Sequence, residues 1–164
     1  MLYVSLHQYP FYPWTGGLRE TGAGPGRGAT VNLPFPAGTA GDAYRLAFDE
    51  VVVPLAEEFA PSWLLISAGF DAHRSDPLTD LGLSSGDFSD LTAAAVRLVP
   101  AGRVVAFLEG GYDLTSLAAS AGACVAALAG ARYLPEPSSR GEITDAARDV
   151  VATAAQLHDV AVTP

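Results

Sequence analysis

The feature that most constrains the fold is a short apolar run that stops abruptly in a polar turn. Residues 64–66 read Leu-Leu-Ile, with no alternation of polar and apolar side chains. Such a run is typical of a strand covered on both faces, as in a parallel sheet under helices. Gly69 and Asp71 follow almost at once. Because open α/β sheets bind ligands beyond the carboxyl ends of their strands, we expect Asp71 to lie at a functional edge.

Two other segments have the same form. An apolar run at 103–108 leads into a Glu-Gly-Gly-Tyr turn that ends at Tyr112, and a strand at 2–7 carries Ser5 and His7. If the three strands are parallel neighbours, their polar groups converge on one rim. The alternation of strands and helices predicts an α/β fold with a mainly parallel sheet and helices on both faces.

Composition excludes several classes of protein. The chain has 164 residues, of which 49% are hydrophobic, so we expect a single domain over 1–164 rather than a disordered chain. A net charge of −9 argues against a nucleic-acid partner. Cys124 is the only cysteine, which excludes a disulfide framework and fits a cytoplasmic protein. No apolar run approaches the roughly 20 residues that span a bilayer, so we expect no membrane partner.

After the strand at 2–7, the sequence of the first half of the chain predicts one further strand and one helix. Residues 29–35 read as a short edge strand ended by Pro34. Apolar side chains at spacings of three and four predict a helix over 42–59, with Asp42 as its N-cap and a break near Pro54.

The second half predicts three helices. The first runs over 84–98 and begins with Ser84 and Asp87 at the spacing of a capping box. The next two are expected from Asp113 or Thr115 to about residue 131, and over 144–158, with a linker at 135–143 between them.

Candidate chemical residues allow more than one role from their positions alone. Asp71 suits a metal ligand, a base or a turn cap, and His73 suits a ligand or a surface residue. Asp76 precedes a proline, which is typical of a residue that starts a turn. Tyr112 follows two glycines and suits either a hydrogen-bond donor to an oxyanion or a ring packed under the next helix. The pair Ser5 and His7 suggests a serine hydrolase, but the Gly-x-Ser-x-Gly elbow is absent.

Four motifs together resemble a known family. In chain order they are Ser5-Leu6-His7, a Gly-x-Gly-x-Gly loop leading to Asn32-Leu33-Pro34, the segment 67–73 with Asp76-Pro77-Leu78, and the segment 109–112. In this order they resemble the motifs of the zinc-dependent histone deacetylases. The residues within the motifs are similar to those of class II enzymes, bacterial acetoin-utilisation proteins and acetylpolyamine amidohydrolases. The resemblance covers about residues 2–130 and implies part of the three-layer arginase/deacetylase sandwich.

The resemblance also implies roles for single residues. Asp71 matches a zinc ligand, and Tyr112 matches the tyrosine that stabilises the oxyanion of an amide hydrolysis. His73 is not a zinc ligand under this match. Other positions fall at the substrate channel and at a potassium site beside the zinc: Tyr12, Leu78, Gly110 and Gly111 for the channel, and Ser5 and Leu6 for potassium.

The sequence departs from the family pattern in its zinc-binding motifs, and this departure lowers the activity that we expect. The family's histidine pair and its Asp-x-His zinc motif precede the strand at 2–7. This sequence has no histidine pair, and its Asp-x-His at 71–73 lies after that strand. The chain therefore resembles the C-terminal half of a deacetylase for acetyl-lysine-type or acetylpolyamine amides, with one zinc ligand of three. We expect the isolated chain to bind zinc poorly and to lack deacetylase activity.

The missing family strand also bears on partners. The resemblance places it between the strands at 2–7 and 64–68, so its absence leaves either a direct pairing of these two or an exposed edge. Exposed edges favour pairing with other chains, which predicts a homo-oligomer or a separate N-terminal half as partner. The alternative is a non-catalytic binding or assembly module that retains the fold.

Overall fold

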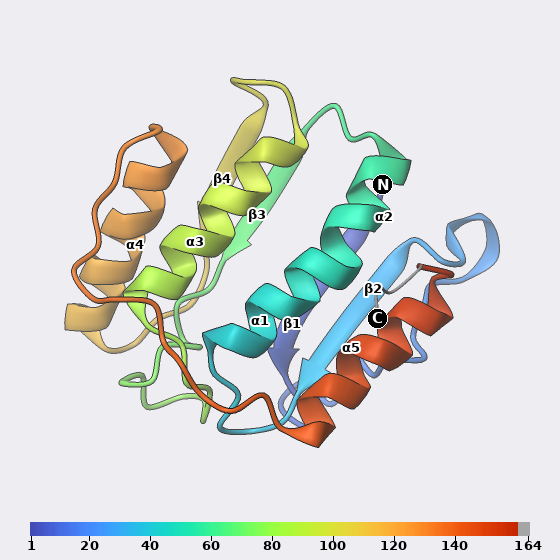
Figure 1. Ribbon diagram of the computed structural model, residues 1–164, viewed down its shortest axis with the longest axis horizontal. Coiled ribbons are helices and arrows are strands. Elements are labelled where there is room, and N and C mark those ends of the chain that lie inside the picture. The colour runs from blue at the N-terminus through green and yellow to red at the C-terminus, as the bar shows by residue number, and fades with distance from the viewer. Residues whose placement is uncertain (161–164) are drawn as a thin grey trace.

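Two pairs of parallel strands form the centre of the molecule (Figure 1). The computed structural model describes residues 1–160. β1 (Tyr3–Gln8) pairs with β2 (Thr30–Phe35), and β3 (Leu64–Ala68) pairs with β4 (Val104–Leu108). Within the described residues, β1 and β3 are not hydrogen-bonded to each other. Of the two outcomes expected for the missing strand, the structure has the exposed edge rather than direct pairing.

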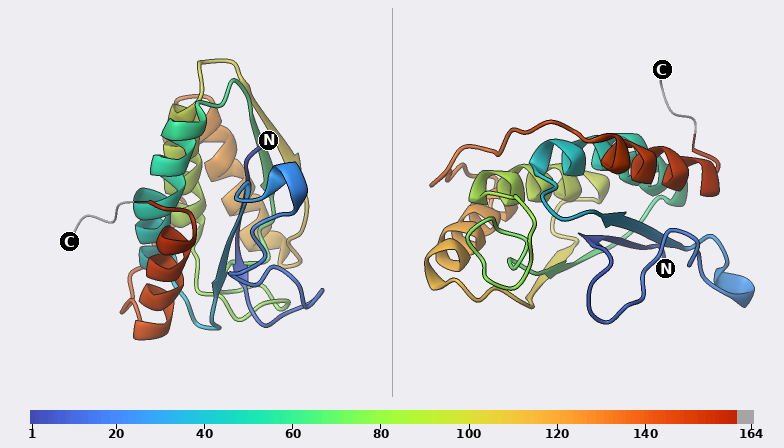
Figure 2. Two further views of the ribbon diagram at one scale, coloured as in Figure 1. Left: turned by 90° about the vertical axis from the view of Figure 1, so that its right-hand side faces the viewer. Right: turned by 90° about the horizontal axis from the view of Figure 1, so that it is seen from below.

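Most helices lie on one side of these strands. Figure 2 shows α1, α2, α3 and α5 along one side, and the loop between β1 and β2 on the other. The helical segments in chain order are η1 (Gly24–Gly26), α1 (Gly41–Ala47), η2 (Phe48–Val52), α2 (Val53–Phe59), α3 (Ser85–Ala95), η3 (Val96–Leu98), α4 (Leu114–Leu128) and α5 (Asp145–Leu157). The predicted parallel α/β architecture is confirmed.

The helix expected over 42–59 is interrupted before its proline. η2 is a π-helix, in which the N–H of Val53 donates to the carbonyl of Phe48, five residues earlier. The chain stays helical from 41 to 59, because Val52 and Val53 also have αR dihedral angles. Pro54 follows directly after the π-helix, so the expected break takes the form of a change in hydrogen-bond pattern just before the proline.

Two predicted element boundaries are wrong. Ala40, not Asp42, is the N-cap of α1, because the Asp42 carboxylate instead pairs with Arg45 and accepts the N–H of Gly141. β2 does not end at Pro34 but continues to Phe35. A strand paired on one side only tolerates a proline whose missing N–H points away from its partner.

The capping predicted from the sequence is confirmed for α3 and α4, and α5 begins with a cap of the same kind. Ser84 and Asp87 form a capping box at α3, and the Asp113 carboxylate accepts the N–H of Ser116 at α4. Thr144 caps α5 by accepting the N–H of Ala147. Local side-chain chemistry thus fixes where these helices begin.

The core lies around β2. Residues 31–35 are all buried, α5 packs on this strand, and the Phe35 ring lies 4.9 Å from the Tyr44 ring of α1, measured between centroids. β4 differs, because Val105, Phe107 and Leu108 are exposed. Among the described residues, no helix is both long and apolar enough to cross a bilayer.

Candidate active site

The ends of β3 and β4 bring the two main candidate motifs side by side. The parallel register places Ala68 opposite Leu108, and the pairing extends beyond the strands. The N–H of Glu109 donates to the carbonyl of Ala68 at 3.0 Å, and the N–H of Phe70 donates to the carbonyl of Gly110 at 2.9 Å. The predicted convergence of these two strand ends is therefore present.

Gly110 lies beside both the Asp71 carboxylate and the Tyr112 ring. A methyl group built on Gly110 would lie 3.1 Å from Oδ2 of Asp71 and 3.8 Å from Cε2 of Tyr112. The Tyr112 side chain is 61% exposed, so its ring is not packed beneath α4. A carboxylate and a phenol thus flank a backbone position that only glycine fits without displacing a neighbour.

Asp71 occupies an environment that disfavours its own charge. Burial raises the pKa of Asp71, and the nearby charge of Asp76 raises it further. Within residues 1–160 the Asp71 carboxylate forms no ion pair. The phenol of Tyr44 is fully buried, finds no hydrogen-bond partner among the described residues, and has its pKa raised by burial and by the Asp71 charge. A cation beside Asp71 would offset the negative charges of Asp71 and Asp76.

A complete zinc centre does not fit the residues present. No group of three His, Cys, Asp or Glu side chains with metal-binding geometry occurs in the described part of the chain. His73 is 2% exposed, with Nε2 donating to Glu136 at 2.8 Å and Nδ1 accepting the N–H of Ser75 at 3.1 Å. Both ring nitrogens are therefore occupied, and Asp71 is the one family-matched zinc ligand here.

Ser5 and His7 form a hydrogen-bonded pair that lacks the third member of a catalytic triad. Oγ of Ser5 lies 2.9 Å from Nδ1 of His7, whose Nε2 lies 3.1 Å from the carbonyl of Gly16. Burial lowers the pKa of His7 against the opposing effect of these hydrogen bonds. A carbonyl accepts only if Nε2 carries the proton, so the Ser5 hydroxyl donates to Nδ1. The geometry does not favour a serine hydrolase, and it leaves the lone pairs of the Ser5 oxygen free.

The expected channel and potassium residues lie on β1 and on the loops that follow β1, β3 and β4. Tyr12 is 79% exposed and Leu78 is 43% exposed, so neither is buried as a core anchor. Gln8 at the end of β1 accepts the N–H of Asp80 at 2.8 Å, which joins this strand end to the loop that carries Leu78. Ser5 and Leu6, the residues matched to potassium, lie on β1.

Two carboxylates in this region were missed as site residues from the sequence. Asp76 does start a turn, accepting the N–H of Leu78 at 3.0 Å, but its other oxygen also accepts the N–H of Tyr112 at 2.6 Å. Glu136, in the segment expected to be a linker, bonds His73 and Arg74. No local pattern signals these bonds, because the bonded residues are 36 and 63 positions apart in the chain. In the sequence, only the Asp76-Pro77 pair could have drawn attention to Asp76.

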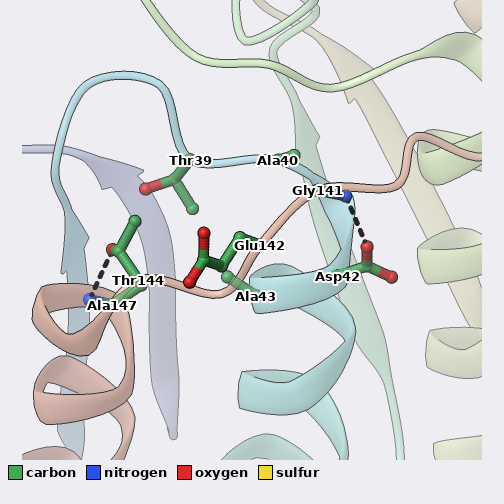
Figure 3. Close-up of a pocket in the computed structure, with 8 residues that line it drawn as sticks. All are labelled: Thr39, Ala40, Asp42, Ala43, Gly141, Glu142, Thr144 and Ala147. Atoms are coloured by element: carbon green, nitrogen blue, oxygen red, sulfur yellow. Dashed lines mark hydrogen bonds between the residues drawn. The ribbon is translucent and has the colours of Figure 1, made fainter.

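A small pocket elsewhere lies where two segments of the chain pack together, and we do not assign it as a second candidate active site. Figure 3 shows it between the start of α1 and the segment before α5, with the Asp42 carboxylate accepting the N–H of Gly141. Its lining residues are Thr39, Ala40, Asp42, Ala43, Gly141, Glu142, Thr144 and Ala147. Asp71 and Tyr112 are not among them.

Comparison with known proteins assigns the family. Residues 1–128 match the histone deacetylase domain. Over 151 residues the chain is 44% identical to "Histone deacetylase 10, chloroplastic" of Oryza sativa subsp. japonica, covering 90% of this chain and 33% of that protein. It is 43% identical over 117 residues to a "Probable deacetylase" of Archaeoglobus fulgidus, covering 70% of this chain and 33% of that protein.

Solved structures agree with the sequence comparison. The histone deacetylase Clr3 matches with a TM-score of 0.88 and 35% identity, over 96% of this chain and 27% of that chain. The HDA15 HD domain matches with a TM-score of 0.83 and 35% identity, over 96% of this chain and 43% of that chain. The chain thus spans about a third of the curated relatives. The resemblance read from the motifs is confirmed, and the chain belongs to the histone deacetylase family.

Proposed function

We propose that this chain supplies the Asp71 and Tyr112 part of a zinc-dependent deacetylase active site. The observation that carries the proposal is the position of Gly110, which lies beside both the Asp71 carboxylate and the ring of Tyr112. The substrate class is an acetylated amine, either an acetyl-lysine-type amide or an acetylpolyamine.

The two side chains suit complementary tasks at such a site. Asp71 is a half-buried carboxylate without an ion-pair partner in the described residues, and an anion of this kind suits one ligand position of a divalent cation. Tyr112 presents an exposed phenol at the rim, where it can donate a hydrogen bond to the oxygen that gains charge during amide hydrolysis. Ser5 and Leu6 remain the proposed potassium residues, and Tyr12 and Leu78 the proposed channel residues.

The isolated chain is proposed to be inactive and to bind zinc poorly. Catalytic zinc sites use three protein ligands, and the described residues supply one. The cytoplasmic compartment expected from the single cysteine stays a prediction.

The remainder of a deacetylase domain, or a second copy of this chain, is the proposed partner. The free edges of β1 and β3 and the exposed side chains of Leu65, Phe107 and Leu108 support it. Apolar side chains gathered beside unpaired strands are typical of surfaces that pack against another element. A light-scattering mass that stays monomeric at every concentration, in a preparation without a second chain, would contradict self-association.

A chimera tests the function directly. Residues 1–128 would replace the matching third of the Archaeoglobus fulgidus protein, and the product would be assayed with an acetyl-lysine peptide and an acetylated polyamine. We expect turnover of one of them. Asp71→Asn should lower both zinc content and activity, whereas Tyr112→Phe should keep the zinc and lower kcat by about a hundredfold or more.

Matched substitutions control for general damage. Tyr133 is also exposed and Asp90 lies on the surface of α3, so Tyr133→Phe and Asp90→Asn should change neither zinc content nor turnover. A zinc-loaded but inactive chimera would favour the alternative, a non-catalytic binding or assembly module with the deacetylase fold. Equal activity of the Tyr112→Phe and Tyr133→Phe proteins would remove Tyr112 from the proposed chemistry.

A further inference from the structure

The Tyr112 loop, residues 109–113, is hydrogen-bonded to one buried carboxylate, that of Asp76. Asp76 is 6% exposed, and its Oδ2 accepts the N–H of Tyr112 at 2.6 Å and the N–H of Asp113 at 3.0 Å. Oδ1 accepts the N–H of Leu78 at 3.0 Å. One side chain therefore bonds the backbone of two loops that are more than thirty residues apart in the sequence.

Asp76 is fixed relative to Asp71 by the short loop that carries both. The N–H of Asp76 donates to the carbonyl of His73 at 2.8 Å, and Oγ1 of Thr79 donates to the carbonyl of Asp71 at 2.7 Å. Because these bonds lie within one turn, a shift of the Asp76 backbone relative to Asp71 would require the turn to distort.

Other contacts fix the two glycines that precede Tyr112. The N–H of Phe70 donates to the carbonyl of Gly110 at 2.9 Å. Gly111 has a φ of +136°, which favours glycine, and a methyl group built there would lie 3.1 Å from Cβ of Phe70. The Asp76 carboxylate extends this fixation to Tyr112 itself, the residue that follows the glycines.

The ionised form of Asp76 is the form that this arrangement favours. Burial acts to raise the pKa of Asp76, but the N–H groups of Tyr112, Leu78 and Asp113 outweigh it and lower the pKa below its usual range. Charge-assisted bonds of this kind are roughly twice as strong as neutral ones. The Asp76 carboxylate is therefore ionised at neutral pH while it accepts these three N–H groups.

We infer that Asp76 is a positioning residue that sets the place of Tyr112 relative to Asp71. It touches neither substrate nor metal in this role and acts through the backbone of Tyr112 and Asp113. Its functional consequence rests on the proposed function of the chain, whereas the bond between the two loops does not.

Amide hydrogen exchange of the chain, read residue by residue by NMR, tests the inference. Asp76→Ala should speed exchange at the N–H groups of Tyr112 and Asp113 by about tenfold or more, since each loses a charge-assisted bond. The amides of β2 and α5 should keep their wild-type rates. Asp76→Asn, which keeps one acceptor oxygen and the side-chain shape, should give a smaller acceleration at the same two amides and decides the matter if Asp76→Ala does not fold.

A matched carboxylate provides the control. Asp42 also accepts a backbone N–H, that of Gly141, so Asp42→Asn should speed exchange at Gly141 and leave Tyr112 and Asp113 unchanged. Unchanged exchange at both site amides in the Asp76 variants would overturn the inference. Equal acceleration throughout the chain would also overturn it, because it would show loss of general stability rather than of position.

The chimera separates this inference from the proposed function. There, Asp76→Asn should lower kcat at constant zinc content, with little change in KM. A chimera that is inactive with Asp76 intact would defeat the proposed function and leave the exchange result standing. Normal kcat together with fast local exchange would show that Asp76 holds the loop but does not position the Tyr112 hydroxyl for chemistry.

Discussion

The two strand pairs are built alike and buried very differently. Both are short, parallel and five or six residues long. β2 is buried along residues 31–35, between α5 on one side and the loop after β1 on the other. Four of the five residues of β4 are exposed, including Phe107 at 51% and Leu108 at 67%.

This difference indicates where stability and function reside. The β1–β2 side has a closed core that holds the chain together. The β3–β4 side carries the candidate site at its strand ends and an open apolar surface beside it. Two curated relatives are about three times as long as this chain, and we propose that further structure packs on this surface.

The largest expected effect compares one phenylalanine from each pair. Phe35→Ala should lower the free energy of unfolding by about 3–5 kcal/mol, because Phe35 is fully buried against Tyr44. Phe107→Ala should lower it by less than about 1 kcal/mol, because that ring is already half exposed. Denaturant unfolding of both variants checks the contrast, and equal losses would show that the β4 surface is covered in solution.

A smaller effect tests the close packing of α3 against the segment 136–138. A methyl group on Gly86 would lie 2.5 Å from the N of Ser138 and 2.7 Å from the carbonyl carbon of Pro137, both rigid backbone atoms. Gly86→Ala should therefore cost about 1–3 kcal/mol by forcing these segments apart. Gly26→Ala, which meets no atom within 4 Å, is the matched control. Similar melting temperatures for the two variants would contradict close contact between α3 and the segment 136–138.

The smallest effect concerns Glu136 and pH. Burial would raise the pKa of Glu136, but Ser85, His73 and Arg74 outweigh it and lower the pKa to about 2. Since the folded pKa lies below the ordinary value of 4.5, this carboxylate stabilises the fold above about pH 4.5. That contribution is lost as the pH falls toward 2.

Glu136→Gln should isolate this contribution. At neutral pH the variant should be less stable than the wild type by about 1 kcal/mol, and the gap should close as the solution is acidified. Unfolding midpoints measured across this pH range give the comparison. A gap that stays constant with pH would mean that the charge of Glu136 does not contribute.

Sequence reasoning succeeded where the signal was local. Capping at Ser84 and Asp113 lies within three residues of the groups it satisfies, and the β3 and β4 runs end where their motifs begin. Long-range contacts gave no such signal. The bond from the N–H of Gly141 to Asp42, and the bond from the N–H of Tyr112 to Asp76, join segments that only the fold brings together.

Zinc titration of the isolated chain, followed by calorimetry, tests the central claim most directly. The claim is that Asp71 is one ligand of a metal site whose other ligands this chain does not supply. The predicted result is weak binding with no saturation at one zinc per chain. Tight equimolar binding that disappears in Asp71→Asn would contradict it, because the chain would then hold a complete site of its own.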